Sequence, residues 1–164
     1  ASLWNFEAYE ARERNFIEHK GTYMGVLIQV GVNMDNGGVM ITKDPFNKEN
    51  KDAVYIAATR GHNVQVVDNR RIPEQILFTP ESNAVQVLTR SNQEAVISFD
   101  AAGGLKETPI STDRRVLTDV MARNLVKAAF EIKKLFGGEL EQDIEWGYMQ
   151  GRIYILQSRP YIGN

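Results

Sequence analysis

Residues 141–160 have the sequence EQDIEWGYMQGRIYILQSRP, and this stretch decides the fold because it predicts a β-hairpin with two different faces. Asp143 and Glu145 lie two positions apart, with apolar residues between and after them. Successive side chains of a strand point to opposite faces, so the two carboxylates share one face. Gln157 and Arg159 share a face of the second strand by the same rule.

The loop length determines which side chains meet across this hairpin. A two-residue loop would mix carboxylates with apolar side chains on one face. A three-residue loop at 150–152 pairs Glu145 with Gln157 and Asp143 with Arg159. It also collects the apolar residues on the opposite face: Ile144, Trp146, Tyr148, Tyr154 and Leu156. Because a one-residue slip moves every side chain to the other face, the pattern favours the three-residue loop.

The predicted polar face combines two carboxylates, an amide oxygen and a guanidinium. Mg²⁺ prefers oxygen ligands and takes one or two carboxylates together with substrate phosphates. Arginine binds phosphate oxygens through its planar fork. These residues indicate a metal–phosphate site. The alternative is a surface ladder of ion pairs, in which Asp143 and Arg159 form an ordinary cross-strand pair.

The rest of the chain predicts an α+β fold with a mostly antiparallel sheet, one N-terminal helix and one long helix. Apolar spacing places the helices at residues 3–19 and 112–136, the second capped by residues 111–113 and ended by Gly137-Gly138. Runs rich in Val and Ile predict strands at 24–33, 38–43, 53–59, 64–67, 75–78, 84–89 and 95–99. A turn is expected at 35–38 and a loop at 101–108. This spacing favours hairpins over βαβ repeats.

Composition excludes several classes of protein. The 164 residues are 43% hydrophobic and 24% charged, which fits one folded domain rather than a disordered chain. The 19 Lys and Arg against 21 Asp and Glu argue against a nucleic-acid partner. The absence of cysteine excludes disulfides and thiolate chemistry. No apolar run approaches the ~20 residues of a membrane helix, and no signal-peptide pattern opens the chain, so we expect a cytoplasmic protein.

Two blocks of the sequence resemble a known family. DIEW at 143–146, followed by IYILQSRP at 153–160, is similar to the end of the nucleotide-binding domain of pyruvate phosphate dikinase and phosphoenolpyruvate synthase. Rifampicin phosphotransferase and the plant glucan water dikinases share that domain. VLIQV at 26–30 and GVMITKDP at 38–45 resemble a second motif of the same domain. The resemblance runs in order along almost the whole chain.

The resemblance implies an ATP-grasp fold, in which residues 1–164 form a single C-terminal lobe within a larger multidomain enzyme. It implies ATP and Mg²⁺ as cofactors, with Asp143, Glu145 and Gln157 holding the metal and the phosphates. Arg159 would be catalytic, because it would neutralise charge on the transferred phosphoryl group. Four residues would border the adenine, mostly through backbone groups: Gln29, Val30, Gly31 and Val32. The alternative for Gln29 is a buried amide that serves its own sheet.

The implied function is that of a dikinase, which uses Mg-ATP to phosphorylate a histidine and then pyruvate or a similar acceptor. The implied partners are ATP, a preceding N-terminal lobe and a phosphohistidine domain of the same parent chain, and this chain alone would transfer no phosphate. Neither His19 nor His62 lies in a phosphohistidine-like context. His62 therefore has two interpretations, as a general base or phosphoacceptor and as a solvated loop histidine, and the second is favoured.

Two departures from the family pattern favour a different function. Val64 stands where the family has the glutamate of a G-L-G-E stretch, and Gly31 replaces a methionine. A nucleotide-sensing or scaffold module that has lost turnover would tolerate both changes. A third possibility keeps the ATP chemistry but transfers phosphate to a glucan, to water or to an antibiotic.

Overall fold

The computed structural model describes residues 2–50, 52–62, 72–111 and 113–162. The chain divides into two compact units, residues 1–31 and residues 32–164. The strand predicted at 64–67, and Val64 with it, lies outside the described residues.

The first unit carries a 3-10 helix, η1 (Ser2–Trp4), and a short α-helix, α1 (Phe6–Arg14). The side chain of Asn5 caps α1 by accepting a hydrogen bond from the Ala8 backbone N–H at 2.9 Å. The helix predicted over residues 3–19 is therefore too long. It ends early because Phe16 has a φ of 54°, in the left-handed region where a right-handed helix does not continue.

Residues 24–33 were predicted as a buried strand, and this prediction is wrong. The segment has no regular secondary structure, and Val26, Ile28 and Val30 are 78%, 90% and 89% exposed. A Val- and Ile-rich sequence favours a strand only when another strand satisfies its backbone. None of the described strands pairs with this segment.

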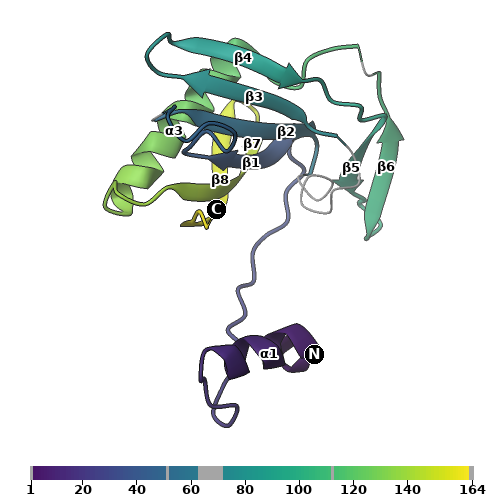
Figure 1. The fold of residues 1–164 in the computed structure, drawn as a ribbon. Helices are drawn as coiled ribbons and strands as arrows, with labels where there is room; N and C mark the ends of the chain where they lie inside the picture. The colour runs from purple at the N-terminus through teal and green to yellow at the C-terminus, as the bar shows by residue number, and fades with distance from the viewer. Residues whose placement is uncertain (1, 51, 63–71, 112, 163–164) are drawn as a thin grey trace. The chain divides into compact units, whose positions relative to one another are not determined.

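The second unit is built on a six-stranded antiparallel sheet in the order β4-β3-β2-β1-β7-β8 (Figure 1). The strands are β1 (Asn36–Ile41), β2 (Val54–Arg60), β3 (Glu74–Thr79), β4 (Ala84–Thr89), β7 (Gln142–Met149) and β8 (Arg152–Pro160). A separate antiparallel pair consists of β5 (Ala95–Phe99) and β6 (Leu105–Pro109). The predicted α+β class and mostly antiparallel pairing are confirmed.

Two of the expected connections are strands instead. The loop predicted at 101–108 is wrong in its second half, because residues 105–109 pair with β5. The turn predicted at 35–38 is wrong because residues 36–38 belong to β1. A Cβ at Gly38 would lie 1.9 Å from the carbonyl oxygen of Ala57, so the glycine permits a close approach of two strands rather than a turn.

The helix α3 (Asp119–Leu135) packs on one face of the six-stranded sheet (Figure 1). Thr118 caps it, several residues after the predicted start, by accepting a hydrogen bond from the Met121 backbone N–H at 3.2 Å. Its predicted end is confirmed, because Gly138 has positive φ and its N–H bonds the carbonyl of Lys133 at 2.9 Å. The buried helix residues are Ala122, Leu125, Val126 and Ala129.

A buried carboxylate joins the sheet to the segment before α3. Glu74 of β3 is fully buried, and its oxygens accept the backbone N–H groups of Val116 and Leu117 at 3.1 and 3.0 Å. The guanidinium of Arg90 lies 3.9 Å away. Glu74 therefore fixes the entry of α3 into the core through hydrogen bonds that satisfy two buried donors.

The β7–β8 hairpin has the predicted pairing of its polar residues but not the predicted loop. Its loop is the two-residue Gln150-Gly151, with φ values of 50° and 79°. Asp143 nevertheless faces Arg159, and Glu145 faces Gln157. A β-bulge explains both observations.

The bulge lies between the Glu145 and Trp146 pairs, and Leu156 is the extra residue of β8. Trp146 faces Ile155 while Glu145 faces Gln157, so Leu156 is inserted between these two pairs. This one extra residue shifts the register of β8 by one position, as a third loop residue would have done. The predicted apolar face is correct for Ile144, Trp146 and Tyr148, which contact the core. It is wrong for Tyr154, which faces Gly147 on the other side, while Ile153 contacts the core instead.

Candidate functional site

The polar residues of the hairpin lie on the sheet face opposite α3. Ile144 and Trp146 are fully buried in the core with the helix, so Asp143 and Glu145, which alternate with them, project the other way. This face continues onto the neighbouring strand β1, whose half-buried Ile41 and Val39 face Asp143 and Glu145. The site therefore combines carboxylates with an adjacent apolar floor.

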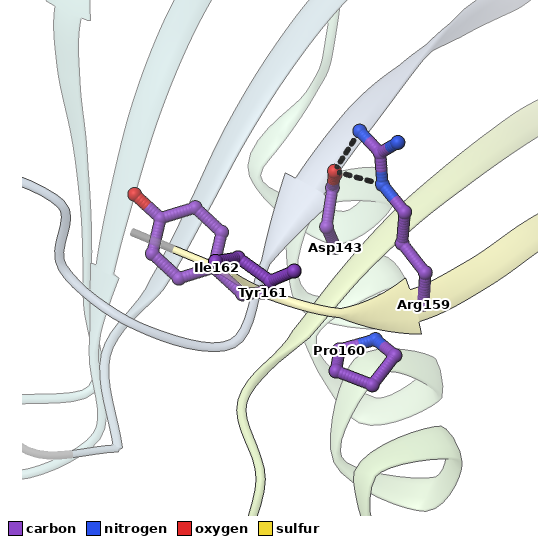
Figure 2. Close-up of a pocket in the computed structure, with 5 residues that line it drawn as sticks. All are labelled: Asp143, Arg159, Pro160, Tyr161 and Ile162. Atoms are coloured by element: carbon purple, nitrogen blue, oxygen red, sulfur yellow. Dashed lines mark hydrogen bonds and ion pairs between the residues drawn. The ribbon is translucent and has the colours of Figure 1, made fainter. Parts of the chain in front are cut away.

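Asp143 and Arg159 form the best-defined contact of the site (Figure 2). Arg159 donates from Nε at 2.9 Å and from Nη2 at 2.8 Å, and both hydrogen bonds go to the same oxygen, Oδ2 of Asp143. The Arg159 side chain is 65% exposed and that of Asp143 20%. The hydrogen bond and charge of Asp143, and then the charge of Glu145, raise the pKa of Arg159 above its ordinary value.

The second cross-strand pair, Glu145 and Gln157, lies next to the first. Gln157 is exposed and Glu145 half-buried. The register thus places two carboxylates, one amide and one guanidinium on adjacent positions of one face. All four hairpin residues predicted for the site are brought together.

A cavity of about 330 Å³ opens at the end of β8 (Figure 2). Asp143 and Arg159 line it together with three residues that the sequence did not indicate: Pro160, Tyr161 and Ile162. The Tyr161 backbone N–H bonds the carbonyl of Glu141 at 2.7 Å, so pairing continues beyond the strand. The alternating pattern ends at Pro160, and no periodicity pointed to the residues after it.

The donor set fits Mg²⁺ with substrate phosphates better than a site built wholly by the protein. The described part of the chain holds no cluster of three or more His, Cys, Asp or Glu side chains suited to a metal. Mg²⁺ in phosphate-handling sites is bound by one or two carboxylates, and phosphates and waters supply the remaining ligands. Within the described ranges both hydrogen bonds from Arg159 go to Oδ2 of Asp143, and none is seen at its second oxygen, Oδ1.

The residues predicted to border the adenine are not part of a strand. Gln29, Val30 and Gly31 are exposed and belong to the first unit, and the half-buried Val32 begins the second. Their role toward the nucleotide stays a prediction. The alternative for Gln29, a buried amide within a sheet, is wrong because the residue is exposed outside any strand.

His62 was expected to be a solvated loop histidine, and it is instead a packed one. Its ring lies edge-on to Phe99 with centroids 4.4 Å apart. Its Nε2 is buried and has no hydrogen-bond partner among the described residues. Burial lowers the pKa of His62, which favours the neutral ring.

None of the helices in the described ranges is sufficiently long and apolar to cross a membrane.

Comparison with known proteins adds a family to this geometry. Residues 1–162 match the family described as "Pyruvate phosphate dikinase, AMP/ATP-binding domain". The chain is 28% identical to the "Probable phosphoenolpyruvate synthase" of Methanocaldococcus jannaschii, over 98% of the chain and 14% of that protein. It is 26% identical to the "Phosphoenolpyruvate synthase" of Pyrococcus furiosus, over 98% of the chain and 21% of that protein. It is also 31% identical to the "Rifampicin phosphotransferase" of Streptomyces sviceus, over 98% and 18%. The chain thus spans about a fifth or less of the length of these three relatives.

Proposed function

The chain belongs to the family of pyruvate phosphate dikinase AMP/ATP-binding domains, and from that premise we propose that it forms the ATP-binding part of a dikinase-type phosphotransferase. The observation that carries the proposal is the hairpin register. It pairs Asp143 with Arg159 and Glu145 with Gln157 on the sheet face opposite α3. The chain matches an ATP-binding domain along its length and carries this set of groups. It is therefore suited to hold a nucleoside triphosphate.

We assign the groups of the site by their chemistry. The carboxylates of Asp143 and Glu145 and the amide oxygen of Gln157 would hold Mg²⁺, which when bound neutralises charge on the phosphate oxygens. Arg159 would contact the transferred phosphoryl group, where a fixed cation stabilises developing charge. The apolar residues of β1 beside the carboxylates would exclude water from one side of the phosphates.

Residues 1–164 would form one lobe of an ATP-grasp domain, with a second lobe closing over the nucleotide. The phosphoryl group would pass to a histidine on another domain of the parent chain and then to pyruvate or a similar acceptor. Relatives named for phosphoenolpyruvate synthesis and for rifampicin phosphotransfer match these residues at similar identity. We therefore assign the choice of acceptor to parts of the protein outside this lobe. As a separate proposal, we place the protein in the cytoplasm.

The second candidate is a nucleotide-sensing or scaffold module. It is favoured by Val64, which stands where the family pattern has a glutamate. Such a module would keep the fold and lose turnover.

Calorimetric titration of ATP, with and without Mg²⁺, tests the proposal on this chain and on the chain joined to the preceding lobe. We expect Mg²⁺-dependent binding by the longer protein and little by the lobe alone. Glu145→Gln should abolish the Mg²⁺-dependent part, whereas Glu131→Gln, which removes an exposed carboxylate from α3, should not. Unchanged affinity in Glu145→Gln would refute the metal assignment. Absence of ATP binding by the longer protein would favour the scaffold module.

A further inference from the structure

Arg159 and Asp143 are bound to each other although the proposed function needs each of them for another partner. Both N–H groups of the guanidinium converge on one oxygen, Asp143 Oδ2, rather than pairing with both carboxylate oxygens. The group suited to phosphate and the group suited to a cation therefore satisfy each other.

We propose that Arg159 is a cation-sensitive latch. It occupies the Asp143 carboxylate until a divalent cation takes that carboxylate, and it is then released to contact the phosphates of the nucleotide. The inference rests on the proposed function for the identity of the ligands. It adds an order of events, in which the cation bound at Asp143 makes the arginine available.

The charges around the pair indicate that Arg159 and a divalent cation would serve the same carboxylate. Asp143 and Glu145 project from the same face two residues apart, and the Asp143 side chain is only 20% exposed. Like charges on neighbouring positions of one face disfavour each other. Arg159 lies opposite Asp143, and its charge interacts with both. A divalent cation supplies more positive charge to the same carboxylates and removes the need for the guanidinium.

The exposure of Arg159 explains why its release is easy. Its side chain is 65% exposed and its contact is an exposed ion pair, a kind of contact that is weak in water. Only side-chain rotation is required, because β8 holds the backbone in the sheet whether or not the ion pair exists. Tyr161 and Ile162 line the same cavity as Arg159 (Figure 2).

The latch predicts opposite effects of one substitution on two ligands. In Arg159→Gln the cation no longer competes with a guanidinium, so Mn²⁺ should bind about three- to tenfold more tightly without nucleotide. In the chain joined to the preceding lobe, the same variant should bind Mg-ATP more weakly, because a phosphate contact is lost. Arg152→Gln is the matched control, since it removes an equal charge from the turn end of the same strand.

Two measurements on this chain test the latch. Mn²⁺ binding without nucleotide is followed by electron paramagnetic resonance in the wild type, Arg159→Gln, Arg152→Gln and Asp143→Asn. In parallel, the Nε–H resonance of Arg159, assigned by its loss in Arg159→Gln, is followed by NMR during titration with Mg²⁺. We expect tighter Mn²⁺ binding only in Arg159→Gln, together with a shift of the Nε–H resonance in the wild type that Asp143→Asn no longer shows with Mg²⁺.

The alternative outcomes separate the latch from the proposed function. Equal or weaker Mn²⁺ binding in Arg159→Gln, with binding lost in Asp143→Asn, would overturn the latch and leave the metal role of Asp143 intact. Equal tightening in Arg152→Gln would also overturn it, because general charge would then explain the effect. Mn²⁺ binding that is absent in the wild type and in every variant, or identical in Asp143→Asn, would overturn both the latch and the metal assignment.

Discussion

Replacing Trp146 should separate the stability of the domain from the chemistry of its site. Trp146 is fully buried, and it pairs with Gly38 of the neighbouring strand β1. Trp146→Ala should lower the free energy of unfolding by about 3–5 kcal/mol, because a large cavity would remain in the core. Glu145→Gln, one residue away on the opposite face, should change it by about 1 kcal/mol or less, because the side chain is only half-buried.

The phenylalanine variant sharpens this prediction. The indole N–H of Trp146 is buried with no hydrogen-bond partner among the described residues, and an unsatisfied buried donor costs about 1–3 kcal/mol. Trp146→Phe removes that donor and keeps most of the ring, so it should be at least about 2 kcal/mol more stable than Trp146→Ala.

Urea unfolding followed by far-UV circular dichroism measures all three variants. The two-face register would be refuted if Trp146→Ala unfolded within about 1 kcal/mol of the wild type. It would equally be refuted if Glu145→Gln were destabilised as strongly as Trp146→Ala. A Trp146→Phe variant as unstable as Trp146→Ala would show instead that the indole shape, and not its buried donor, dominates the energetics.

Three further predictions concern residues that the structure singled out. Gly38→Ala should destabilise the domain by about 3 kcal/mol in urea unfolding, because its Cβ would lie 1.9 Å from a carbonyl oxygen of β2, whereas Gly25→Ala, with no atom within 4 Å, should be neutral. Glu74→Gln should cost about 1–3 kcal/mol, because it weakens hydrogen bonds to two buried N–H groups, and a loss no larger than that of the exposed Glu81→Gln in the same assay would contradict this role. The lowered pKa of His62 means that the unfolded chain binds its proton more readily, so stability should fall as pH drops below the ordinary value of 6.5, and His62→Gln should reduce this pH dependence of the melting temperature.

The β7–β8 hairpin shows which features a sequence pattern can predict and which it cannot. The alternation of polar and apolar residues was sufficient to predict the pairs Asp143–Arg159 and Glu145–Gln157, because only one parity keeps carboxylates out of the core. The pattern did not predict how that parity arises. A longer loop and a bulge satisfy it equally, and the structure has a two-residue loop with a bulge at Leu156.

Element boundaries were harder to predict for a different reason. The long helix begins at Asp119 rather than near residue 112, because Glu74, distant in sequence, takes the backbone donors of the preceding segment. Residues 24–33 have a strand-like composition and form no strand, because no described strand pairs with them. Local propensity is overridden where the decisive partner lies elsewhere.

The sequence by itself determined the fold class, most of the strands of the second unit and the end of α3. It also determined which four polar residues meet on the β7–β8 hairpin. These features depend on local spacing and on the segregation of polar from apolar side chains, and both are written in consecutive residues. Only the tertiary structure decided the contact between Arg159 and Asp143 Oδ2, the cavity beside Tyr161, the burial of Glu74 and the need for Gly38. Each of these depends on atoms that approach from separate strands, and the chain order of residues does not specify such approaches until the sheet has formed.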